Sequence, residues 1–469
     1  MEKNFEVKKV HFVGVGGVGM GTFAVALANY GYEVSGSDKA LYEPMKSVLQ
    51  RANIQFVEGF HSQTAETRKP DLVIIGNVVR RDNPEAQAWL RSGIRFLSFP
   101  EAVRVFLIQD KKSIVCAGTH GKTTTSSWTA FLLQELGLNP SYLIGGVPRD
   151  LASGCQLTDG DVFVCEGDEY DSAFFDKGPK FLHYHPHFAM LLNIEFDHAD
   201  IYKDLAHVQS SFEKLVALIP GDGLCIARYD DRVVMEVVGG ALCPVQTFGL
   251  GSGAMWRLGN VEENESGFHF EALYKGRSVG KFRTPLFGEH NLLNLLSGII
   301  AAVNLGAPIE KVRPIVERFH GARRRQEILL ESPVVLVDDF AHHPTEVAAT
   351  LTAVRRRYPR GKLWALFEPR SATARRSVHQ EAYVKAFDSA DQILVASPFR
   401  QSELTEAERL STDTLVDDLK SRGKDAESFL STDDMVSRIV SGRSGKDIIV
   451  VMSNGEFDKI QSKLVQALK

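Results

Sequence analysis

A chain of 469 residues is too long for one hydrophobic core and, at about 150 residues per domain, it predicts three domains. Its composition is that of a globular enzyme, with 44% hydrophobic and 24% charged residues. The formal net charge of -5 gives no electrostatic reason to expect a nucleic acid or an anionic membrane as partner. These numbers favour an enzyme that acts on small molecules.

Neither export nor membrane insertion is expected. No apolar stretch approaches the roughly 20 residues that span a bilayer, and residues 1–6 lack the apolar core of a signal peptide. The five cysteines are scattered and form no CxxC pair, so the sequence predicts neither a structural zinc site nor a disulfide framework. We expect a cytoplasmic protein with reduced thiols.

The first segment has the pattern of a nucleotide-binding βαβ unit. An apolar strand over residues 9–14 leads into a turn that contains Gly14, Gly16, Gly17 and Gly19, and a second strand ends at Asp38. Such glycines let the backbone approach a phosphate at a helix N-terminus, and an acid about 20 residues on can bind a ribose hydroxyl. Residues 1–108 therefore predict a Rossmann-like domain for a nucleotide-type ligand, which the pattern does not identify as NAD.

The second segment begins with a phosphate-binding loop. The apolar run 113–117 precedes Gly118-Thr119-His120-Gly121-Lys122-Thr123, and Thr124 continues into a helix. This is a shortened form of the loop whose backbone N–H groups hold phosphate, whose Lys supplies a charge and whose Thr ligates Mg²⁺. Residues 109–321 predict a P-loop ATPase-type central domain.

Acidic and histidine side chains follow two strands of this domain. Glu166 ends a strand, where a carboxylate for Mg²⁺ belongs, whereas Asp168, Glu169 and Asp171 fit a solvated acidic turn better. His198 follows the next apolar run and is flanked by Asp197 and Asp200. Residues 223–285 are expected to form a β-rich insert of short strands.

The third segment, residues 322–469, alternates strands and helices as a second Rossmann-like domain does. Polar residues follow its strands at Asp338 to His343, at Glu368 to Ser371 and at Ser453 to Gly455, where doubly wound sheets bind ligands. Arg323 to Arg325 lie at the hinge, and a guanidinium there could face a transferring phosphoryl group. Together, two phosphate loops and a basic third domain suggest an ATP-driven ligase that works through an acyl phosphate.

Motifs along the whole chain, in the correct order, resemble those of the Mur ligases of peptidoglycan synthesis. They are Gly14 to Met20, Gly118 to Thr124, Asn193 to His198, Gly288 to Asn291 and Asp338 to Glu346. Within the family, residues 166–177, 367–371 and 451–455 resemble the branch that returns the tripeptide L-Ala-γ-D-Glu-meso-diaminopimelate to UDP-N-acetylmuramate in murein recycling. The nearest alternative is the biosynthetic branch that adds free L-Ala to the same UDP-sugar.

The resemblance implies roles for individual residues. Lys122, His198, His343 and Arg325 would be catalytic. Thr123 and Glu166 would hold one Mg²⁺ and His198 a second, and His343 and Arg370 would bind the acceptor. Gly14, Gly16, Gly17, Gly19 and Asp38 would bind the UDP-sugar. ATP would contact Gly118, Thr119, His120, Gly121, Lys122, Thr123, Thr124, Asn291, Asn294, Arg325 and Asp339.

Some properties stay open at this point. A monomer or weak homodimer is expected. Several relatives carry a carbamylated lysine about fifteen residues beyond the His198 equivalent; the alanine-adding branch lacks it, and we predict no modification of Lys214. An NAD-dependent dehydrogenase would leave Lys122, Glu166 and His198 without a role. A non-catalytic nucleotide-binding regulator is the remaining alternative.

Overall fold

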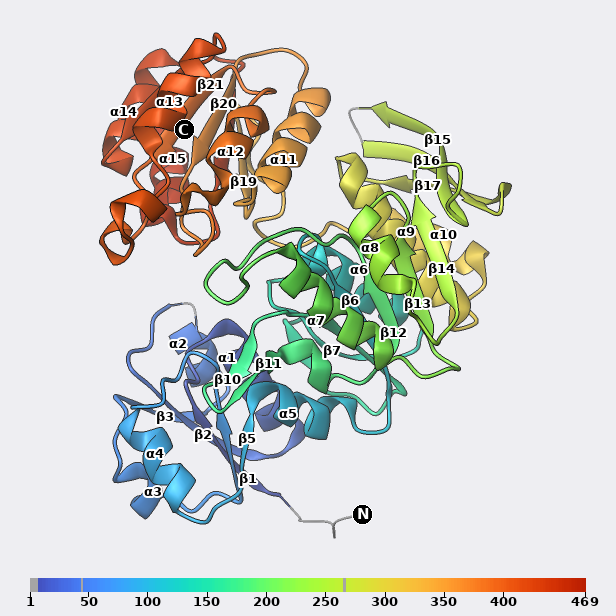
Figure 1. Ribbon diagram of the computed structural model, residues 1–469, viewed down its shortest axis with the longest axis vertical. Coiled ribbons are helices and arrows are strands. Elements are labelled where there is room, and N and C mark those ends of the chain that lie inside the picture. Colours follow the sequence, from blue (N-terminus) through green and yellow to red (C-terminus); the bar gives the residue numbers. More distant parts are fainter. Residues whose placement is uncertain (1–6, 44, 265–266) are drawn as a thin grey trace.

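The computed structural model describes residues 7–43, 45–264 and 267–469, which form three α/β lobes in chain order (Figure 1). The N-terminal lobe (blue) and the C-terminal lobe (orange to red) lie on opposite sides of the central lobe. The expected class, a three-domain α/β protein with Rossmann-like outer domains, is confirmed. Residues 1–6, from which we predicted the absence of a signal peptide, lie outside the described residues.

The N-terminal lobe contains a fully parallel sheet of strand order β3-β2-β1-β4-β5. Its central strands are near-continuous apolar runs, as expected where helices cover both faces of a parallel sheet. The strands are β1 (Lys9–Val13), β2 (Glu33–Asp38), β3 (Gln55–Glu58), β4 (Leu72–Ile75) and β5 (Phe96–Ser98). The helices are α1 (Val18–Tyr30), α2 (Met45–Arg51), α3 (Thr64–Thr67), α4 (Pro84–Arg91) and α5 (Phe99–Val103).

The central lobe is built on a sheet of order β17-β16-β15-β14-β13-β12-β6-β9-β7-β8. Its parallel strands are β6 (Lys112–Ala117), β7 (Ser141–Leu143), β9 (Val162–Gly167), β12 (Pro186–Leu191), β13 (Leu224–Arg228) and β14 (Val245–Gly249). Short β8 (Cys155–Gln156) is antiparallel, and β10 (Asp171–Ala173) pairs with β11 (Asp176–Pro179) in a separate hairpin. The helices are α6 (Lys122–Glu135), α7 (Leu205–Ala217), α8 (Arg232–Val238), α9 (Glu289–Asn304) and α10 (Ile309–Val316).

The expectation of a β-rich insert over 223–285 is only partly correct. β13 and β14 are parallel strands of the central sheet, with α8 between them. The apolar residues of β13 are buried like those of β12, and in β14 Phe248 is buried. Only β15 (Trp256–Asn264), β16 (Gly267–Tyr274) and β17 (Arg277–Thr284) form an antiparallel meander, attached to β14 through β15.

The C-terminal lobe contains a sheet of order β18-β19-β23-β20-β21-β22, parallel except for β18. Its strands are β18 (Glu327–Leu330), β19 (Val335–Asp339), β20 (Leu363–Phe367), β21 (Gln392–Ala396), β22 (Asp425–Phe429) and β23 (Ile448–Met452). Its helices are α11 (Pro344–Arg357), α12 (Gln380–Ala386), α13 (Thr412–Ser421), α14 (Thr432–Gly442) and α15 (Ile460–Leu468).

Side chains connect neighbouring lobes. The Phe175 ring, from the β10–β11 hairpin, packs edge-on against Phe96 of the N-terminal sheet, with 5.4 Å between centroids. On the other side, the backbone N–H of Ala199 donates to Oγ1 of Thr373, at 3.0 Å. Both outer lobes therefore contact the central lobe, where the phosphate loop lies.

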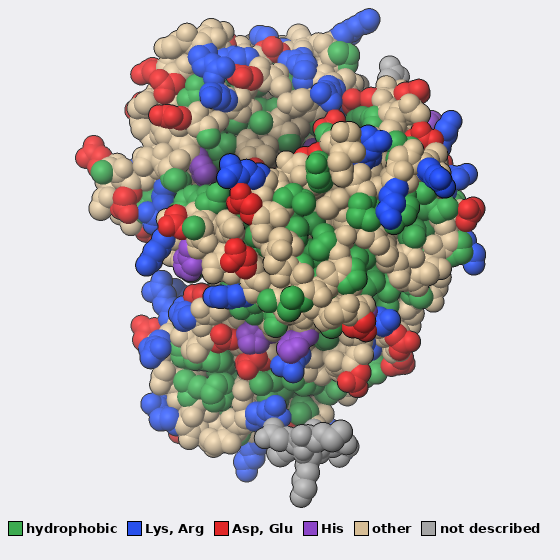
Figure 2. Space-filling model, turned by 45° about the vertical axis from the view of Figure 1, so that its right-hand side comes forward, with side chains coloured by type: hydrophobic (Ala, Val, Ile, Leu, Met, Phe, Trp, Pro, Cys, Tyr) green, Lys and Arg blue, Asp and Glu red, His purple; other side chains and the backbone are tan. Residues whose placement is uncertain are grey.

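The surface is mixed in charge. On the face drawn in Figure 2, Lys and Arg side chains are interspersed with Asp and Glu, in agreement with the small net charge of -5. No helix among the described residues combines the length and the apolar character needed to cross a lipid bilayer.

The contact between α6 and α9 supports the phosphate loop. Trp128 is fully buried, and its indole N–H donates to the Leu295 carbonyl at 2.9 Å. The helices approach closely at Gly298, where an added Cβ would lie 2.4 Å from Cδ1 of Trp128. Since α6 begins at Lys122, this packing positions the helix that follows the loop.

We expect Gly298→Ala to lower the free energy of unfolding by about 1–3 kcal/mol, because the overlap with buried Trp128 outweighs the better helix propensity of alanine. Urea denaturation measures the change. Gly240→Ala is the matched control, because no atom lies within 4 Å of its added Cβ. Equal stability of both variants would contradict this packing.

Candidate active site

The glycine-rich turn of the N-terminal lobe is held by the predicted acid. Asp38, the last residue of β2, accepts the backbone N–H of Gly16 on Oδ2 at 2.7 Å. A Cβ on Gly16 would lie 2.9 Å from the same oxygen, so the approach requires glycine. Asp38 and the turn thus form one unit at the carboxyl end of the sheet, the edge at which such sheets bind ligands.

The phosphate loop lies between β6 and α6 and is fixed by Asn193. The backbone N–H of His120 donates to Oδ1 of Asn193 at 2.7 Å, the N–H of Thr119 donates to the Asn193 carbonyl at 3.0 Å, and the Asn193 amide donates to the His120 carbonyl at 3.1 Å. Gly118 has φ +140°, and a Cβ there would lie 2.9 Å from the Asn193 carbonyl oxygen. The shortened loop is therefore closed against the segment that follows β12.

The Lys122 ammonium is paired with Glu169. Its Nζ lies 3.0 Å from Oε2 and 3.1 Å from Oε1 of Glu169, and Nε2 of His198 lies 2.9 Å from Oε1. Burial lowers the pKa of both Lys122 and His198, but Glu169 outweighs it and raises both. The expectation of a solvated acidic turn is wrong for Glu169, which is 3% exposed, because the chain after β9 folds back over the loop.

Thr123, Glu166 and Arg325 meet at the start of α6. Oγ1 of Thr123 donates to Oε2 of Glu166 at 3.2 Å and accepts from Nη2 of Arg325 at 3.3 Å. Burial raises the pKa of Glu166 despite the Gly145 N–H and the Arg325 charge, so this carboxylate lacks full compensation. Hydroxyl and carboxylate oxygens are the ligands that Mg²⁺ prefers, so this pair fits such an ion.

A cavity of about 320 Å³ opens beside the loop, between the central and C-terminal lobes. Seven of the residues predicted to bind ATP line it: His120, Gly121, Thr124, Asn291, Asn294, Arg325 and Asp339. Gly118, Thr119, Lys122 and Thr123 are not in its lining, although they belong to the same loop. The lining also includes Arg228, Phe248, His290 and Gln326, to which the sequence analysis assigned no role.

Asp339 lies at the end of β19 on the C-terminal side of this cavity. Its oxygens accept the backbone N–H groups of Gln326 at 2.8 Å and Ala341 at 2.7 Å. Burial raises its pKa to about 6, even though Arg325 and these donors act in the opposite direction. The carboxylate therefore shapes the hinge that carries Arg325 as well as lining the cavity.

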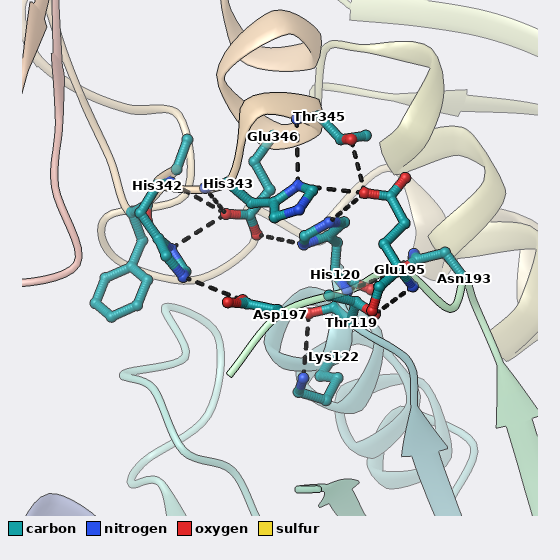
Figure 3. Close-up of polar contacts among 12 residues, drawn as sticks. Thr119, His120, Lys122, Asn193, Glu195, Asp197, His342, His343, Thr345 and Glu346 are labelled. Atoms are coloured by element: carbon teal, nitrogen blue, oxygen red, sulfur yellow. Dashed lines mark hydrogen bonds and ion pairs between the residues drawn. The ribbon is translucent and has the colours of Figure 1, made fainter. Parts of the chain in front are cut away.

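A cluster of acids and histidines joins the phosphate loop to the C-terminal lobe (Figure 3). Glu346 of α11 lies between two imidazoles, with Oε1 3.2 Å from Nδ1 of His120 and Oε2 3.2 Å from Nδ1 of His342. Burial lowers the pKa of both rings. Glu346 outweighs it, together with Glu195 for His120 and Asp197 for His342, and raises the pKa of His120 to about 9 and that of His342 to about 10. The His120–Glu346 pair attaches the C-terminal lobe to the loop, and the His342–Glu346 pair lies within that lobe.

The two predicted acceptor residues lie in different surroundings. His343 caps α11, is 6% exposed, and its Nδ1 lies 3.2 Å from Oε2 of Glu195. Burial lowers the pKa of His343 to about 4, so its ring is neutral. Arg370 follows β20, where its guanidinium lies 3.9 Å from the Phe399 ring centroid and 3.4 Å from Glu368. His343 and Arg370 form no hydrogen bond or ion pair with each other.

Lys214 lies on the exposed face of α7. Its side chain forms no hydrogen bond or ion pair with the described residues of the candidate site.

Besides Arg228, Phe248, His290 and Gln326 of the cavity, five residues around the loop had no role in the sequence analysis: Glu169, Asn193, Glu195, His342 and Glu346. Four of them stand inside the motifs that carried the family resemblance, and that position was the available signal. Their roles depend on contacts between separate segments, such as that of His120 with Asn193, 73 residues apart, which no local pattern contains.

Comparisons with known proteins agree with this geometry. Family models match residues 9–111 (Mur ligase family, catalytic domain), 116–302 (Mur ligase middle domain) and 324–455 (Mur ligase, glutamate ligase domain). The UDP-N-acetylmuramate–L-alanyl-γ-D-glutamyl-meso-2,6-diaminoheptandioate ligase of Escherichia coli is 35% identical over 98% of both chains. The chain belongs to the Mur ligase family.

Two further Mur ligases show where this chain stands within the family. The solved structure of a murein peptide ligase from Psychrobacter arcticus 273-4 matches with a TM-score of 0.73 and 30% identity, covering 98% of each chain. A UDP-N-acetylmuramate–L-alanine ligase of Acetivibrio thermocellus is 32% identical over 97% of this chain and 94% of its own length. The predicted family is confirmed. The tripeptide branch is favoured because the ligases named for the tripeptide in Escherichia coli and Haemophilus influenzae are 35% and 34% identical, against 32% for this L-alanine ligase.

The imidazolium pairs predict how the stability of this Mur ligase depends on pH. Histidine has a pKa of about 6.5 in an unfolded chain, and that of His342 is about 10 in the fold, so its contribution is complete below pH 6.5. The contribution is lost as the pH rises towards 10, with a scale of about 1.4 kcal/mol per pKa unit. We expect His342→Gln to lower the thermal midpoint more at pH 7 than at pH 10.

Melting curves of the wild type and of His342→Gln, recorded at pH 7 and pH 10 with a chelator present, measure the change in thermal midpoint. His61→Gln, at an exposed position of the N-terminal lobe, is the control and should leave the thermal midpoint unchanged at both pH values. An equal loss of stability for His342→Gln at both pH values would contradict a charged His342.

Proposed function

We propose that this chain is an ATP-dependent ligase that joins L-Ala-γ-D-Glu-meso-diaminopimelate to UDP-N-acetylmuramate, in peptidoglycan recycling in the cytoplasm. The observation that carries the proposal is its full-length similarity to a ligase whose name states these two substrates, at 35% identity over 98% of both chains. The reaction forms one amide bond and converts ATP to ADP and phosphate.

The three lobes suggest a division of labour. Residues 1–108 would bind the UDP-sugar through Gly14, Gly16, Gly17, Gly19 and Asp38, which the Asp38–Gly16 contact supports. Residues 109–321 would bind ATP, and residues 322–469 the peptide, through His343 and Arg370. A monomer or weak homodimer remains the prediction for the assembly.

ATP fits the cavity beside the phosphate loop. Asn291 and Asn294 would face the adenine, Asp339 the ribose, and Lys122 and Arg325 the phosphates, with loop N–H groups of Gly118 to Thr124 around them. Lys122 would exchange part of its contact with Glu169 for phosphate oxygens. Because Glu169 also contacts His198, the same carboxylate would keep both groups positioned.

Mur ligases use Mg²⁺ with ATP, and the structure offers two separate groups that fit such ions. Thr123 and Glu166 would hold one ion, and His198 with Glu169 a second. When bound, Mg²⁺ neutralises phosphate charge and polarises the transferred phosphoryl group. Two ions are our proposal.

The chemistry divides amide formation into two steps. A lactyl carboxylate oxygen of the muramate would attack the γ-phosphorus, the bond to the β–γ bridging oxygen would break, and ADP would leave. The amine nitrogen of the L-Ala residue would then attack the acyl carbon, lose a proton and expel phosphate. Lys122 and Arg325 would stabilise the charge that develops on the phosphoryl oxygens.

Addition of free L-Ala to UDP-N-acetylmuramate is the second candidate, because a ligase named for that reaction is 32% identical over 97% of this chain. Phosphate release with ATP, Mg²⁺ and UDP-N-acetylmuramate, measured separately with L-Ala and with the tripeptide, distinguishes the two. We expect turnover with the tripeptide and little with L-Ala. Turnover with L-Ala alone would assign the chain to the biosynthetic reaction.

Lys122→Ala should lower kcat by about 100- to 1000-fold, since it removes a fixed positive charge from the transferring phosphoryl group. Lys177→Ala is the matched control, because that side chain is 69% exposed and pairs only with Asp171, and its kcat should stay within about twofold. The assay is product formation with the tripeptide. Full activity of Lys122→Ala would contradict this role of Lys122. Absence of product with the wild type would favour a non-catalytic nucleotide-binding regulator, and tight binding of reduced nicotinamide would favour a dehydrogenase.

A further inference from the structure

Three side chains from separate segments converge where the phosphate loop meets α11 (Figure 3). Oε2 of Glu195 lies 3.2 Å from Nε2 of His120 and 3.2 Å from Nδ1 of His343. Each of these three side chains offers one atom that could bind a metal ion. Among the residues that the structure describes, these three atoms lie within 4.8 Å of one another. Neither Glu166 nor His198, our candidates for Mg²⁺, is one of these three side chains.

The hydrogen bonds available to His343 do not satisfy its ring. Its Nδ1 accepts the backbone N–H of Thr345 at 3.3 Å, yet it also faces the acceptor oxygen of Glu195. A proton on Nδ1 would serve Glu195 and remove the cap of α11, and a proton on Nε2 would point into the protein, where Nε2 is buried without a partner. Neither neutral tautomer satisfies every contact. A cation that took the Nδ1 lone pair would satisfy Oε2 of Glu195 in place of the Thr345 N–H contact, with the ring proton on Nε2.

We propose that His120, Glu195 and His343 bind one divalent cation of the Zn²⁺ type. Tetrahedral Zn²⁺, with bonds of about 2.0–2.2 Å to nitrogen and oxygen, separates its ligand atoms by roughly 3.3 Å. The two separations of 3.2 Å to Glu195 match this spacing. Two imidazoles and one carboxylate favour Zn²⁺ over Mg²⁺, which prefers oxygen ligands alone.

The neighbouring side chains have the arrangement that supports metal-bound histidine. With Nε2 of His120 on the ion, its Nδ1 would still face Oε1 of Glu346, 3.2 Å away, and would carry the ring proton. Metal-ligating histidines commonly donate their second N–H to a carboxylate in this way. The Thr345 hydroxyl donates to Oε2 of Glu195 at 2.7 Å and orients that ligand. The cation takes the place of the proton on Nε2 of His120, which passes to solvent.

The position of the site gives it a consequence. His120 and Glu195 belong to the central lobe, and His343 caps the first helix of the C-terminal lobe, so the ion joins the two. His120 and Glu195 also line the cavity beside the phosphate loop, from which the ion is reached. A bound Zn²⁺ therefore holds the lobes together across the loop and inhibits reactions that require them to separate.

The test uses the full-length, metal-free chain without nucleotide or peptide, in excess Mg²⁺ so that the predicted Mg²⁺ groups are occupied. Calorimetric titration with Zn²⁺ should give one site per chain, and Co²⁺ should give the intense visible absorption of a tetrahedral complex. His343→Asn and Glu346→Gln should each weaken binding by at least about tenfold. His61→Asn, at an exposed position, and His198→Asn should bind Zn²⁺ as the wild type does.

A second variant guards against loss of binding through misfolding. His343→Cys should retain Co²⁺ and acquire a sulfur-to-cobalt charge-transfer band in the near ultraviolet, which arises only if residue 343 is a ligand. Unchanged affinity in His343→Asn, loss of the site in His198→Asn, or a cobalt spectrum of His343→Cys without that band would each overturn the proposal. Because no substrate is present, these outcomes are independent of whether the chain is the proposed ligase.

Discussion

Two positive charges enclosed at the phosphate loop, those of His120 and Lys122, are the constraint on which the rest of the site depends. A buried cation is tolerated only beside a carboxylate, and each of these charges has its own: Glu346 and Glu195 for His120, and Glu169 for Lys122. The three carboxylates come from different segments of the chain. The loop therefore orders β9, β12 and α11 around itself, and the cavity forms where they meet.

These pairings also explain why the site spans two lobes. Glu346 reaches His120 from α11, Thr345 reaches Glu195, and Arg325 reaches Thr123 from the hinge. A ligand that changes the charge at the loop acts directly on the contact between lobes. ATP phosphates would add negative charge beside Lys122. The proposed Zn²⁺ ion would instead replace a proton on His120. The two ligands would therefore change the contact between the central and C-terminal lobes in different ways.

The sequence predicted the loops well because their chemistry is local. Gly118 needs a positive φ and space against Asn193, which a glycine in the loop motif indicates. Asp38 ends the strand that follows α1, so its distance in sequence from the glycine-rich turn was enough to assign both to one site, where they are in contact. Glu169 shows where such reasoning fails. It stands in a run of acidic residues that resembles a solvated turn, and only its return towards Lys122 and His198, 47 and 29 residues away, makes it a buried counter-charge. The prediction of a β-rich insert over residues 223–285 was partly wrong for the same reason, because the parallel pairing of β13 with β12 is a contact between separate segments.

The sequence by itself determined the α/β class, the two nucleotide loops, the candidate residues Lys122, Glu166, His198 and Arg325, and the family to which the chain belongs. It did so because turn geometry and strand-end polarity are encoded within a few residues. The tertiary structure alone decided which carboxylate neutralises which cation, that His343 lies beside His120 and not beside Arg370, and that Glu195 joins the two histidines. Charge compensation in a buried site depends on distances of about 3 Å, and only folding brings residues so far apart in the chain to that separation.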